Sequence, residues 1–342
     1  MSGRDIASMK PIVITGARGY IGSSLVERLT SEGYALRLVS RSAVASVGDA
    51  SAPVEHIQAD LRDTAKWHAL IADAGAVIHL SSRTDLRAAE ADPAGDYNLN
   101  VEPVRALVRA AEQSERPMPV VFASTVTIVG DEHANPVDER TPDRPCSVYD
   151  RHKLECETIL REATHHGVVR ACSLRLSNVY GYGISSVNSN RGILNSMMKR
   201  ATNGEPLTLF GDGAYLRDFT HIGDVFDAFR RVLATPSAFD GSHYVVATGQ
   251  GRSLAEAFAL VAAEALKDSG HGIEVHRLPE PADLHPIERR NFVGNSGLFH
   301  KLTGWRARID LASGIRDYFE QEARAGLGLR LARSSATASM SP

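Results

Sequence analysis

The sequence has few cysteines and no long apolar run, and both shortages limit what the protein can be. Its 342 residues include only three cysteines, Cys146, Cys156 and Cys172. A sparse, odd set predicts a reducing compartment and no disulfide framework. No apolar stretch approaches the roughly 20 residues of a membrane-spanning helix, and the first ten residues lack the apolar segment of a signal peptide. We therefore expect a cytoplasmic protein without a membrane anchor.

Excess charge and metal-ligand motifs are also lacking. The formal net charge is −3, so no overall basic field favours nucleic acid. The 13 histidines include no HExxH pair and none beside a cysteine pair, and those spacings are typical of zinc sites. These features predict neither a nucleic-acid partner nor a bound metal ion.

Short apolar segments alternate with amphipathic ones through the first half of the chain. Segments rich in Val, Ile and Leu predict strands at 11–15, 35–40, 54–59, 76–81, 120–125 and 171–179. Helical periodicity predicts helices at 21–32, 63–73, 97–114 and 148–165. Strands buried on both faces and separated by helices indicate an α/β fold with a doubly wound parallel sheet of the Rossmann type.

The second half predicts a smaller lobe interleaved with this domain. Loops become more frequent after about residue 180, and further helices are expected at 193–203, 224–234, 253–267 and 309–322. We assign residues 1–177, rejoined by about 215–240, to a dinucleotide-binding domain. Residues 178–214 and 241–325 are assigned to a substrate-binding lobe, and the small, polar segment 326–342 is expected to be a disordered tail.

The segment ITGARGYIG carries three glycines at a fixed spacing. Gly16, Gly19 and Gly22 follow a predicted strand and open a predicted helix. There the first glycine permits a tight turn, the second lets a pyrophosphate approach the backbone, and the third allows close packing of helix and strand. Free N–H groups at the helix start attract phosphate. The motif predicts a dinucleotide site, the alternative being a glycine turn without a ligand.

The end of the second strand predicts which dinucleotide binds. A carboxylate there bonds the ribose 2′-hydroxyl of NAD, whereas an arginine accommodates the 2′-phosphate of NADP. This strand ends in Ser40 and Arg41, and Arg18 lies in the glycine turn. Two guanidiniums favour NADP(H), with NAD(H) as the alternative if both are only solvent-exposed. Asp60 is predicted to meet the adenine or, alternatively, to cap a helix.

A hydroxyl, a phenol and an ammonium group are expected to meet at the carboxyl ends of the strands. Thr125 ends a predicted strand, and Tyr149 and Lys153 lie four residues apart on one face of a predicted helix. A tyrosine pKa of about 10 is too high for proton exchange near neutrality, but a neighbouring ammonium group lowers it. The Thr125 hydroxyl can bond an oxygen whose charge changes during hydride transfer. The set predicts an oxidoreductase.

These motifs together resemble those of a known family. With ADLRD, VIHLSS, NLNVEPVRALVRAA, STVTIVG, YDRHK, RLSNVYG and RDFTHIGDV, residues 10–325 are similar to extended short-chain dehydrogenase/reductases of the NAD(P)-dependent nucleotide-sugar epimerase/dehydratase group. The resemblance implies that Thr125, Tyr149 and Lys153 are catalytic. It also implies a homodimer through helices 97–114 and 148–165, although the apolar face of the first fits packing on its own sheet equally well.

The resemblance also implies a set of cofactor-binding residues. It places Ser124 beside the nicotinamide, Leu80 and Ser81 at the cofactor ribose, and Asn100 behind the nicotinamide. With the residues next to these motifs, the predicted cofactor-binding set is Gly16, Arg18, Gly19, Tyr20, Ile21, Gly22, Ser40, Arg41, Asp60, Leu61, Leu80, Ser81, Ser82, Asn100, Ser124, Tyr149 and Lys153.

On the substrate side the resemblance implies a nucleoside-diphosphate sugar, linked to dTDP or UDP. Asn178 and Arg217 match residues that hold the diphosphate, which suits their amide and guanidinium donors. The alternative for Arg217 is an ion pair with Asp218 or Asp224. The arginine that the family places before a proline is His285 here, so that contact is not implied. The predicted substrate-binding residues are Arg83, Thr125, Asn178, Asn195 and Arg217.

The residues after Thr125 narrow the reaction. Family dehydratases have Asp-Glu there, whereas this sequence has Val126 and Thr127, so water elimination is not expected. Arg18 and Arg41 favour an NADPH-dependent 4-ketoreductase of 4-keto-6-deoxysugars over an NAD-dependent 4-epimerase. More distant alternatives are a non-catalytic NADP-binding sensor and a reductase of small ketones. The loops at 83–96 and 181–192 are expected to select base and sugar.

Overall fold

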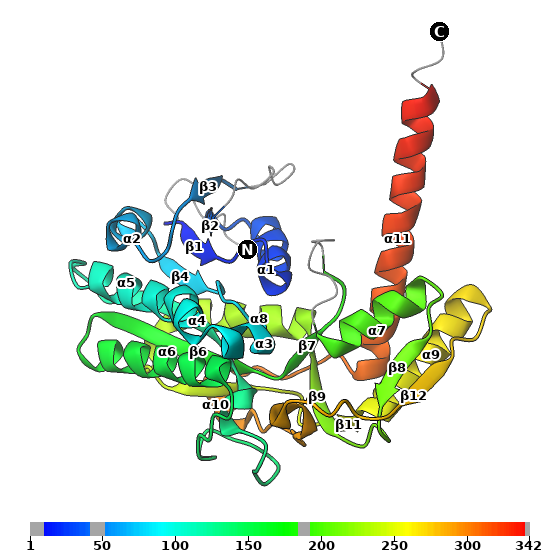
Figure 1. The fold of residues 1–342 in the computed structure, drawn as a ribbon. Coiled ribbons are helices and arrows are strands. Elements are labelled where there is room, and N and C mark those ends of the chain that lie inside the picture. Colours follow the sequence, from blue (N-terminus) through cyan, green and yellow to red (C-terminus); the bar gives the residue numbers. More distant parts are fainter. Residues whose placement is uncertain (1–9, 42–51, 184–191, 339–342) are drawn as a thin grey trace.

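A seven-stranded parallel sheet forms the centre of the larger lobe (Figure 1). The computed structural model describes residues 10–41, 52–183 and 192–338, with side chains described as far as residue 325. The strand order is β10-β6-β5-β4-β1-β2-β3. The strands are β1 (Ile12–Thr15), β2 (Leu36–Ser40), β3 (Val54–Gln58), β4 (Ala76–His79), β5 (Met118–Thr125), β6 (Val169–Leu176) and β10 (His243–Val246). The predicted doubly wound α/β fold is therefore confirmed.

Helices cover both faces of this sheet because its strands are apolar on both sides. The helices of the larger lobe are α1 (Tyr20–Ser31), α2 (Thr64–Ile71), α3 (Leu86–Ala91), α4 (Pro93–Asn100), α5 (Glu102–Ala111), α6 (Val148–His165), α8 (Ile222–Ala234) and α10 (Gly297–Thr303). One core contains Leu25 of α1 and Phe229 of α8. The other contains Trp67 of α2, Leu107 of α5 and Leu160 of α6. The sheet thus separates two apolar layers.

The helix predicted at 97–114 is wrong in its bounds. The structure has two helices, α4 and α5, with Val101 between them. Pro103 has no N–H to donate to a carbonyl four residues earlier, and its ring clashes with that carbonyl, so one continuous helix is not formed. The expected loop at 83–96 is also largely helical, because Asp85 and Asp92 accept backbone hydrogen bonds at the starts of α3 and α4.

The smaller lobe is built from two short sheets and three helices. Its three-stranded sheet has the order β11-β9-β7, and its two-stranded sheet pairs β12 with β8. The core between them includes Tyr180, Phe258 and Tyr318. The elements are β7 (Asn178–Tyr180), α7 (Ile193–Thr202), β8 (Leu207–Phe210), β9 (Leu216–His221), β11 (Gly251–Ser253), α9 (Leu254–Ser269), β12 (Val275–Leu278) and α11 (Leu311–Ala338).

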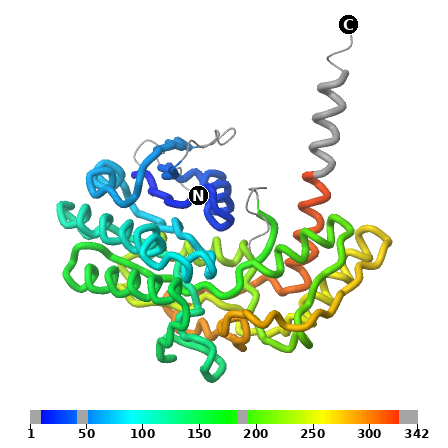
Figure 2. Tube along the Cα trace, in the orientation of Figure 1, coloured from blue at the N-terminus to red at the C-terminus, as the bar shows by residue number. Residues whose placement is uncertain are grey.

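The chain crosses between the lobes more often than the predicted boundaries allow (Figure 2). Strand β10, assigned to the smaller lobe, pairs with β6 in the large sheet, whereas β9, assigned to the larger lobe, pairs with β7 and β11. Helix α11 continues to Ala338, into the segment expected to be a disordered tail. Leu, Ala and Arg, which are good helix formers, recur in the first part of the segment 326–342.

Candidate active site

A cleft of about 470 Å³ lies where the carboxyl ends of the large-sheet strands face the smaller lobe. Of the predicted residues, it is lined by Gly16, Gly19, Tyr20, Ile21, Gly22, Leu80, Ser81, Ser82, Ser124, Thr125, Tyr149, Lys153 and Asn178. These residues come from the ends of β1, β4 and β5, the starts of α1 and α6, and β7. The structure therefore brings the glycine turn and the three predicted catalytic residues to one place.

The glycine turn has the backbone geometry that a dinucleotide site needs. Gly16 has a φ of +69°, and a Cβ there would lie 2.8 Å from the Ser81 backbone nitrogen. A Cβ on Gly22 would lie 2.2 Å from the Gly16 carbonyl oxygen, so α1 packs directly on the turn. Gly19 precedes α1 without a side-chain cap, which leaves N–H groups at the helix start for an anion. These residues fit a bound pyrophosphate.

The predicted adenosine end lies outside the cleft-lining set. The guanidinium of Arg62 donates from Nε to the Asp60 carboxylate at 2.9 Å, and these hydrogen bonds lower the Asp60 pKa to about 2. Arg41 lies close enough to attract the same carboxylate. Leu61 is buried, and its carbonyl accepts a hydrogen bond from the Trp67 indole. The Asp60 carboxylate therefore lies near two guanidiniums, those of Arg41 and Arg62.

The three predicted catalytic residues converge from β5 and α6. Thr125 ends β5, and Ser147 accepts a hydrogen bond from the Asp150 N–H to begin α6, which carries Tyr149 and Lys153. The buried Lys153 ammonium donates to the Ala123 carbonyl at 2.8 Å and lies 5.7 Å from the centre of the Tyr149 ring. Burial lowers the Lys153 pKa to about 8. A cation thus lies beside the phenol that would exchange the proton.

Ser124, one residue before Thr125, is fixed by a buried ion network. Its hydroxyl donates to the Glu157 carboxylate, which also pairs with Arg175. Arg175 reaches Asp143 at 2.6 Å as well. Because Ser124 is buried and bonded to this network, the network holds the end of β5 in place.

Arg217 does not line the cleft, contrary to its predicted place in the substrate site. Its guanidinium is buried beneath the 288–290 segment and donates to the carbonyls of Glu288 and Arg290. Neither Asp218 nor Asp224 accepts from it; they accept backbone N–H groups such as those of Thr248 and Ile309. Arg217 thus positions a loop through its five donors, which can bind carbonyls as well as phosphates.

Arg290 is the guanidinium that the structure places in the cleft, and the sequence did not single it out. It is 7% exposed, and its Nε has no hydrogen-bond partner among the described residues. One Nη donates to the Ile287 carbonyl at 2.7 Å, and the other lies 3.4 Å from Asn178 Oδ1. The adjacent Arg289 is exposed and pairs with Glu280, so only the fold distinguishes the two arginines.

Three more predicted residues support the cleft without lining it. The Arg83 guanidinium donates to the buried Asp96 at 3.0 Å. Asn100 accepts from the Arg83 N–H at 2.8 Å and from the Ser82 hydroxyl. Asn195, also buried, accepts from the Gly181 N–H at 3.0 Å. Their hydrogen bonds fix the segments that follow β4 and β7. Residues 184–191 of the predicted 181–192 loop lie outside the described residues.

Residues 12–247 match the NAD dependent epimerase/dehydratase family. The chain belongs to this family. The resemblance that its motifs predict is therefore confirmed, and the family membership agrees with the cleft, where a dinucleotide turn and a tyrosine–lysine pair meet.

Individual members of the epimerase/dehydratase family match over most of the chain. UDP-glucose 4-epimerase of Mycolicibacterium smegmatis is 27% identical, covering 89% of this chain and 95% of that protein. A UDP-glucose 4-epimerase structure from Thermus thermophilus in complex with NAD is 26% identical, with a TM-score of 0.75, covering 91% of this chain and 98% of the other. The Thermotoga maritima UDP-glucose 4-epimerase with UDP-glucose has the same fold, with a TM-score of 0.80 at 22% identity over 92% of this chain and 99% of the other.

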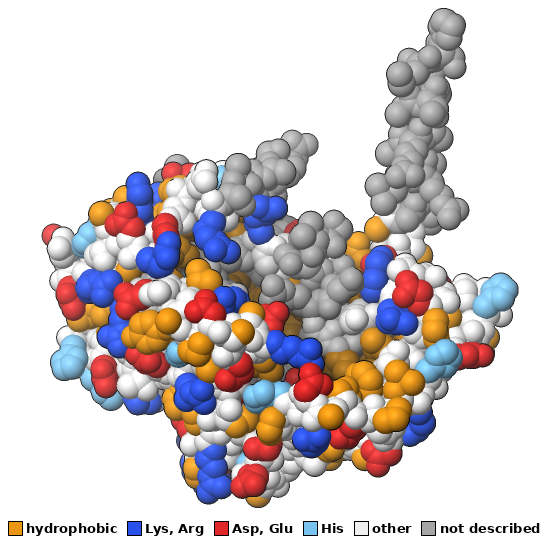
Figure 3. Space-filling view, viewed as in Figure 1, with side chains coloured by type: hydrophobic (Ala, Val, Ile, Leu, Met, Phe, Trp, Pro, Cys, Tyr) orange, Lys and Arg blue, Asp and Glu red, His pale blue; other side chains and the backbone are white. Residues whose placement is uncertain are grey.

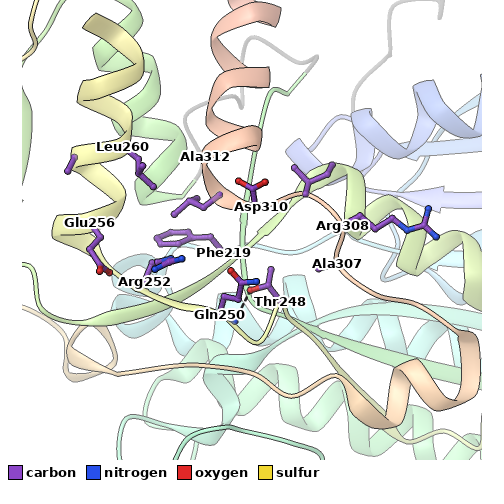
Figure 4. Close-up of a pocket in the computed structure, with 13 residues that line it drawn as sticks. Phe219, Thr248, Gln250, Arg252, Glu256, Leu260, Ala307, Arg308, Asp310 and Ala312 are labelled. Carbon is purple, nitrogen blue, oxygen red and sulfur yellow. Dashed lines mark hydrogen bonds between the residues drawn. The ribbon is translucent and has the colours of Figure 1, made fainter. Parts of the chain in front are cut away.

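A second, larger cavity of about 590 Å³ lies in the smaller lobe, away from the epimerase/dehydratase cleft (Figure 4). Phe219 of β9 and Leu260 of α9 border its apolar part, with the charged Arg252, Glu256 and Asp310 around them. It contains none of the predicted site residues. The volume of a cavity alone therefore does not identify the active site, because catalysis needs convergent polar groups such as those that line the cleft.

The rest of the described surface carries no single strong signal. Basic and acidic side chains are interspersed on the face that Figure 3 shows. Within the described residues, no group of three or more His, Cys, Asp and Glu side chains is arranged to hold a metal ion. No helix in this part of the chain is both long and apolar enough to cross a bilayer.

Proposed function

We propose that the protein is a nucleoside-diphosphate-sugar 4-epimerase that uses bound NAD. The observation that carries the proposal is the cleft itself, which is lined by Thr125, Tyr149 and Lys153 and also by Asn178 and Arg290. Groups that can exchange a proton and donors that suit a diphosphate thus line the same cleft. The proposal is also supported by the 4-epimerases among the similar proteins.

The residues of this chain divide the work of such a reaction. Tyr149, as the phenolate, accepts the proton of the sugar C4 hydroxyl and later returns it. Lys153 favours the phenolate by its charge, since its Nζ lies near the Tyr149 ring. The glycine turn and Ser124 hold the dinucleotide, and Asn178 and Arg290 hold the diphosphate. A bound NAD supplies the reversible uptake of a hydride from carbon.

The absence of carboxylates after Thr125 bears on the choice of reaction. Val126 and Thr127 occupy the two positions where a dehydratase has an acid and a base. Water elimination needs both groups, because a proton must leave one carbon as the hydroxyl of another is protonated. Redox chemistry at one carbon needs neither, which favours epimerisation or reduction at C4.

The first experiment is to identify the cofactor and the reaction together. The purified enzyme is heat-denatured and the released nucleotide is identified, and UDP-glucose and dTDP-glucose are incubated with the intact enzyme and followed by NMR. We expect NAD in the released fraction and formation of the C4 epimer. An enzyme that is isolated empty, prefers NADPH and forms no epimer would contradict the proposal.

Tyr149→Phe tests the proton exchange. Removal of the phenol should lower turnover by about a hundredfold or more, with NAD still bound. Tyr97→Phe is the matched control, because the Tyr97 hydroxyl contacts Glu155 outside the cleft, and it should keep nearly full turnover. Near-normal turnover of Tyr149→Phe would refute the proposed acid and base.

An NADPH-dependent 4-ketoreductase is the second candidate. Arg18 and Arg41 near the adenosine end favour it, since guanidiniums accommodate a 2′-phosphate. The Asp60 carboxylate beside Arg41 weakens that argument, because a carboxylate repels phosphate and accepts ribose hydroxyls. Titration of the cofactor-free enzyme with NADH and NADPH separates the two candidates.

A further inference from the structure

The side chain of Tyr20 links the glycine turn to the smaller lobe. Tyr20 follows Gly19 as the first residue of α1, and it lines the cleft. Its hydroxyl donates to the Gly181 carbonyl at 2.8 Å, across 161 residues of sequence. Burial raises the pKa of the phenol above its ordinary value, so the hydroxyl keeps its hydrogen near neutral pH. The two lobes are therefore joined here by a hydrogen bond with a fixed donor.

Gly181 is held by side chains from both lobes. Its carbonyl accepts from Tyr20 of α1, while its N–H donates to the side-chain oxygen of Asn195 of α7 at 3.0 Å. A Cβ on Gly181 would lie 2.7 Å from Nε2 of His221, so its backbone packs directly against the end of β9. Three elements that are far apart in the sequence thus fix the position of one residue.

The position of Gly181 matters because of the strand before it. Strand β7 ends at Tyr180, and Asn178, its first residue, lines the cleft. In the proposed function Asn178 holds the diphosphate of the sugar nucleotide. The N–H of Tyr20 belongs to the uncapped start of α1, where the pyrophosphate of a dinucleotide fits. Tyr20 therefore faces the cofactor site with its backbone and holds the substrate strand with its hydroxyl.

We propose that Tyr20 is a positioning residue that sets the place of Asn178 relative to the bound cofactor. The inference rests on the proposed function for its ligand, a nucleoside diphosphate. Hydride transfer requires the nicotinamide and the sugar carbon to be in contact, and a small displacement of either slows it strongly. Because the two ligands are held by different lobes, a hydrogen bond between the lobes beside both sites controls their relative position.

Loss of this hydrogen bond should act on the substrate and leave the cofactor alone. Helix α1 is anchored independently, since its Leu25, Val26 and Leu29 belong to one core of the larger lobe. The N–H of Tyr20 is also kept when the residue becomes phenylalanine. The Gly181 carbonyl, in contrast, loses the donor that ties it to the larger lobe, and the end of β7 gains freedom. Substrate binding must then restore the native position, which reduces the apparent affinity.

The test compares Tyr20→Phe with Tyr244→Phe, each of which removes one hydroxyl from a buried tyrosine. The Tyr244 hydroxyl lies 3.2 Å from the Asp240 carboxylate, and Tyr244 belongs to β10, outside the cleft-lining set. Calorimetry gives the dissociation constant of UDP on the NAD-saturated protein and that of NADH on the cofactor-free protein. We expect Tyr20→Phe to raise the UDP constant about twofold to tenfold, the worth of one hydrogen bond. Its NADH constant should stay within about twofold, and Tyr244→Phe should equal wild type for both ligands.

An unchanged UDP constant in Tyr20→Phe would overturn the inference. So would a comparable loss of UDP and NADH affinity, because it would mean that the whole cleft is disturbed. Both variants lose one hydrogen bond and should unfold at similarly lowered denaturant concentrations. A difference in UDP binding between them therefore reports the position of the substrate strand and not the stability of the fold.

Failure of the proposed function is a separate outcome. A wild type that binds UDP without forming a C4 epimer would contradict the 4-epimerase, while the UDP constants of the two variants would still decide the role of Tyr20. A wild type that binds dTDP in place of UDP is compared with its variants in dTDP. If the wild type binds neither nucleotide, both the inference and the proposed function are wrong.

Discussion

Arg175 in the larger lobe and Arg217 in the smaller one are both almost completely buried, yet their partners differ. Arg175 pairs with the carboxylates of Glu157 and Asp143. Burial opposes its charge, but the two carboxylates outweigh that cost and hold its pKa above the ordinary value. Arg217 donates mainly to backbone carbonyls, and burial with the nearby Arg290 charge lowers its pKa to about 9.

The difference separates a region without excess positive charge from one that keeps its positive charge. Around Arg175 two carboxylates face one guanidinium, so this region can hold Ser124 without an excess positive charge that would attract an anion. Arg217 and Arg290 lie together with the half-exposed Glu288 as the nearest carboxylate. Arg290 lines the cleft and Arg217 lies behind it, so their positive charge favours an anion such as a diphosphate there.

Arg175→Met should give the largest effect, because it leaves the buried Glu157 carboxylate without a cation. We expect the free energy of unfolding to fall by about 3–5 kcal/mol, measured by chemical denaturation. Arg109→Met removes an exposed ion pair with Glu102 and should cost at most about 1 kcal/mol. If both variants lost the same free energy of unfolding, the Arg175 network would stabilise the larger lobe no more than an exposed ion pair does.

Arg290→Met should act on binding and leave the cofactor alone. Loss of a charged hydrogen-bond donor weakens binding by about 1.5–3 kcal/mol, roughly 10- to 150-fold. We expect that loss for UDP, measured by calorimetry, with NADH affinity within about twofold of wild type. Arg289→Met, which changes the adjacent exposed arginine, is the control. An equal loss of NADH affinity would mean that Arg290 maintains the shape of the cleft and does not bind the diphosphate.

Acid should act on both lobes through buried histidines. Burial, with the charge of Lys153, lowers the His79 pKa to about 3, and burial lowers that of His221 to about 4. The unfolded chain takes up protons at these residues below pH 6.5, while the folded protein does not. The free energy of unfolding therefore falls as pH falls from about 6.5, by about 1.4 kcal/mol per unit for each histidine.

His79→Asn and His221→Asn should each lower the slope of the free energy of unfolding against pH, near pH 5, by about 1.4 kcal/mol per unit. Unequal slopes for His79 and His221 would mean that the two lobes do not unfold together.

The larger lobe could be predicted from the sequence because its signals are local. Apolar runs mark each strand, and Tyr149 and Lys153 are one helical turn apart, so a single helix fixes their relation. On the substrate side, Arg290 contacts Asn178, which lies 112 residues away in the sequence. No sequence motif predicts a contact over that separation. Arg83 and Arg217 carry guanidiniums that could bind a phosphate. In the structure, however, they donate hydrogen bonds to the Asp96 carboxylate and to the carbonyls of Glu288 and Arg290.

The position of β10 has a consequence for synthesis of the chain. Strand β6 is complete at Leu176, but its neighbour β10 pairs with it only through residues 243–246. Until those residues leave the ribosome, β6 is the unpaired edge of a growing sheet, and such edges invite pairing with other chains. The first part of the smaller lobe, from β7 to β9, must therefore be made before the sheet of the larger lobe is closed. A fragment that ends after β6 would keep Tyr149 and Lys153 and still lack the strand that completes its sheet.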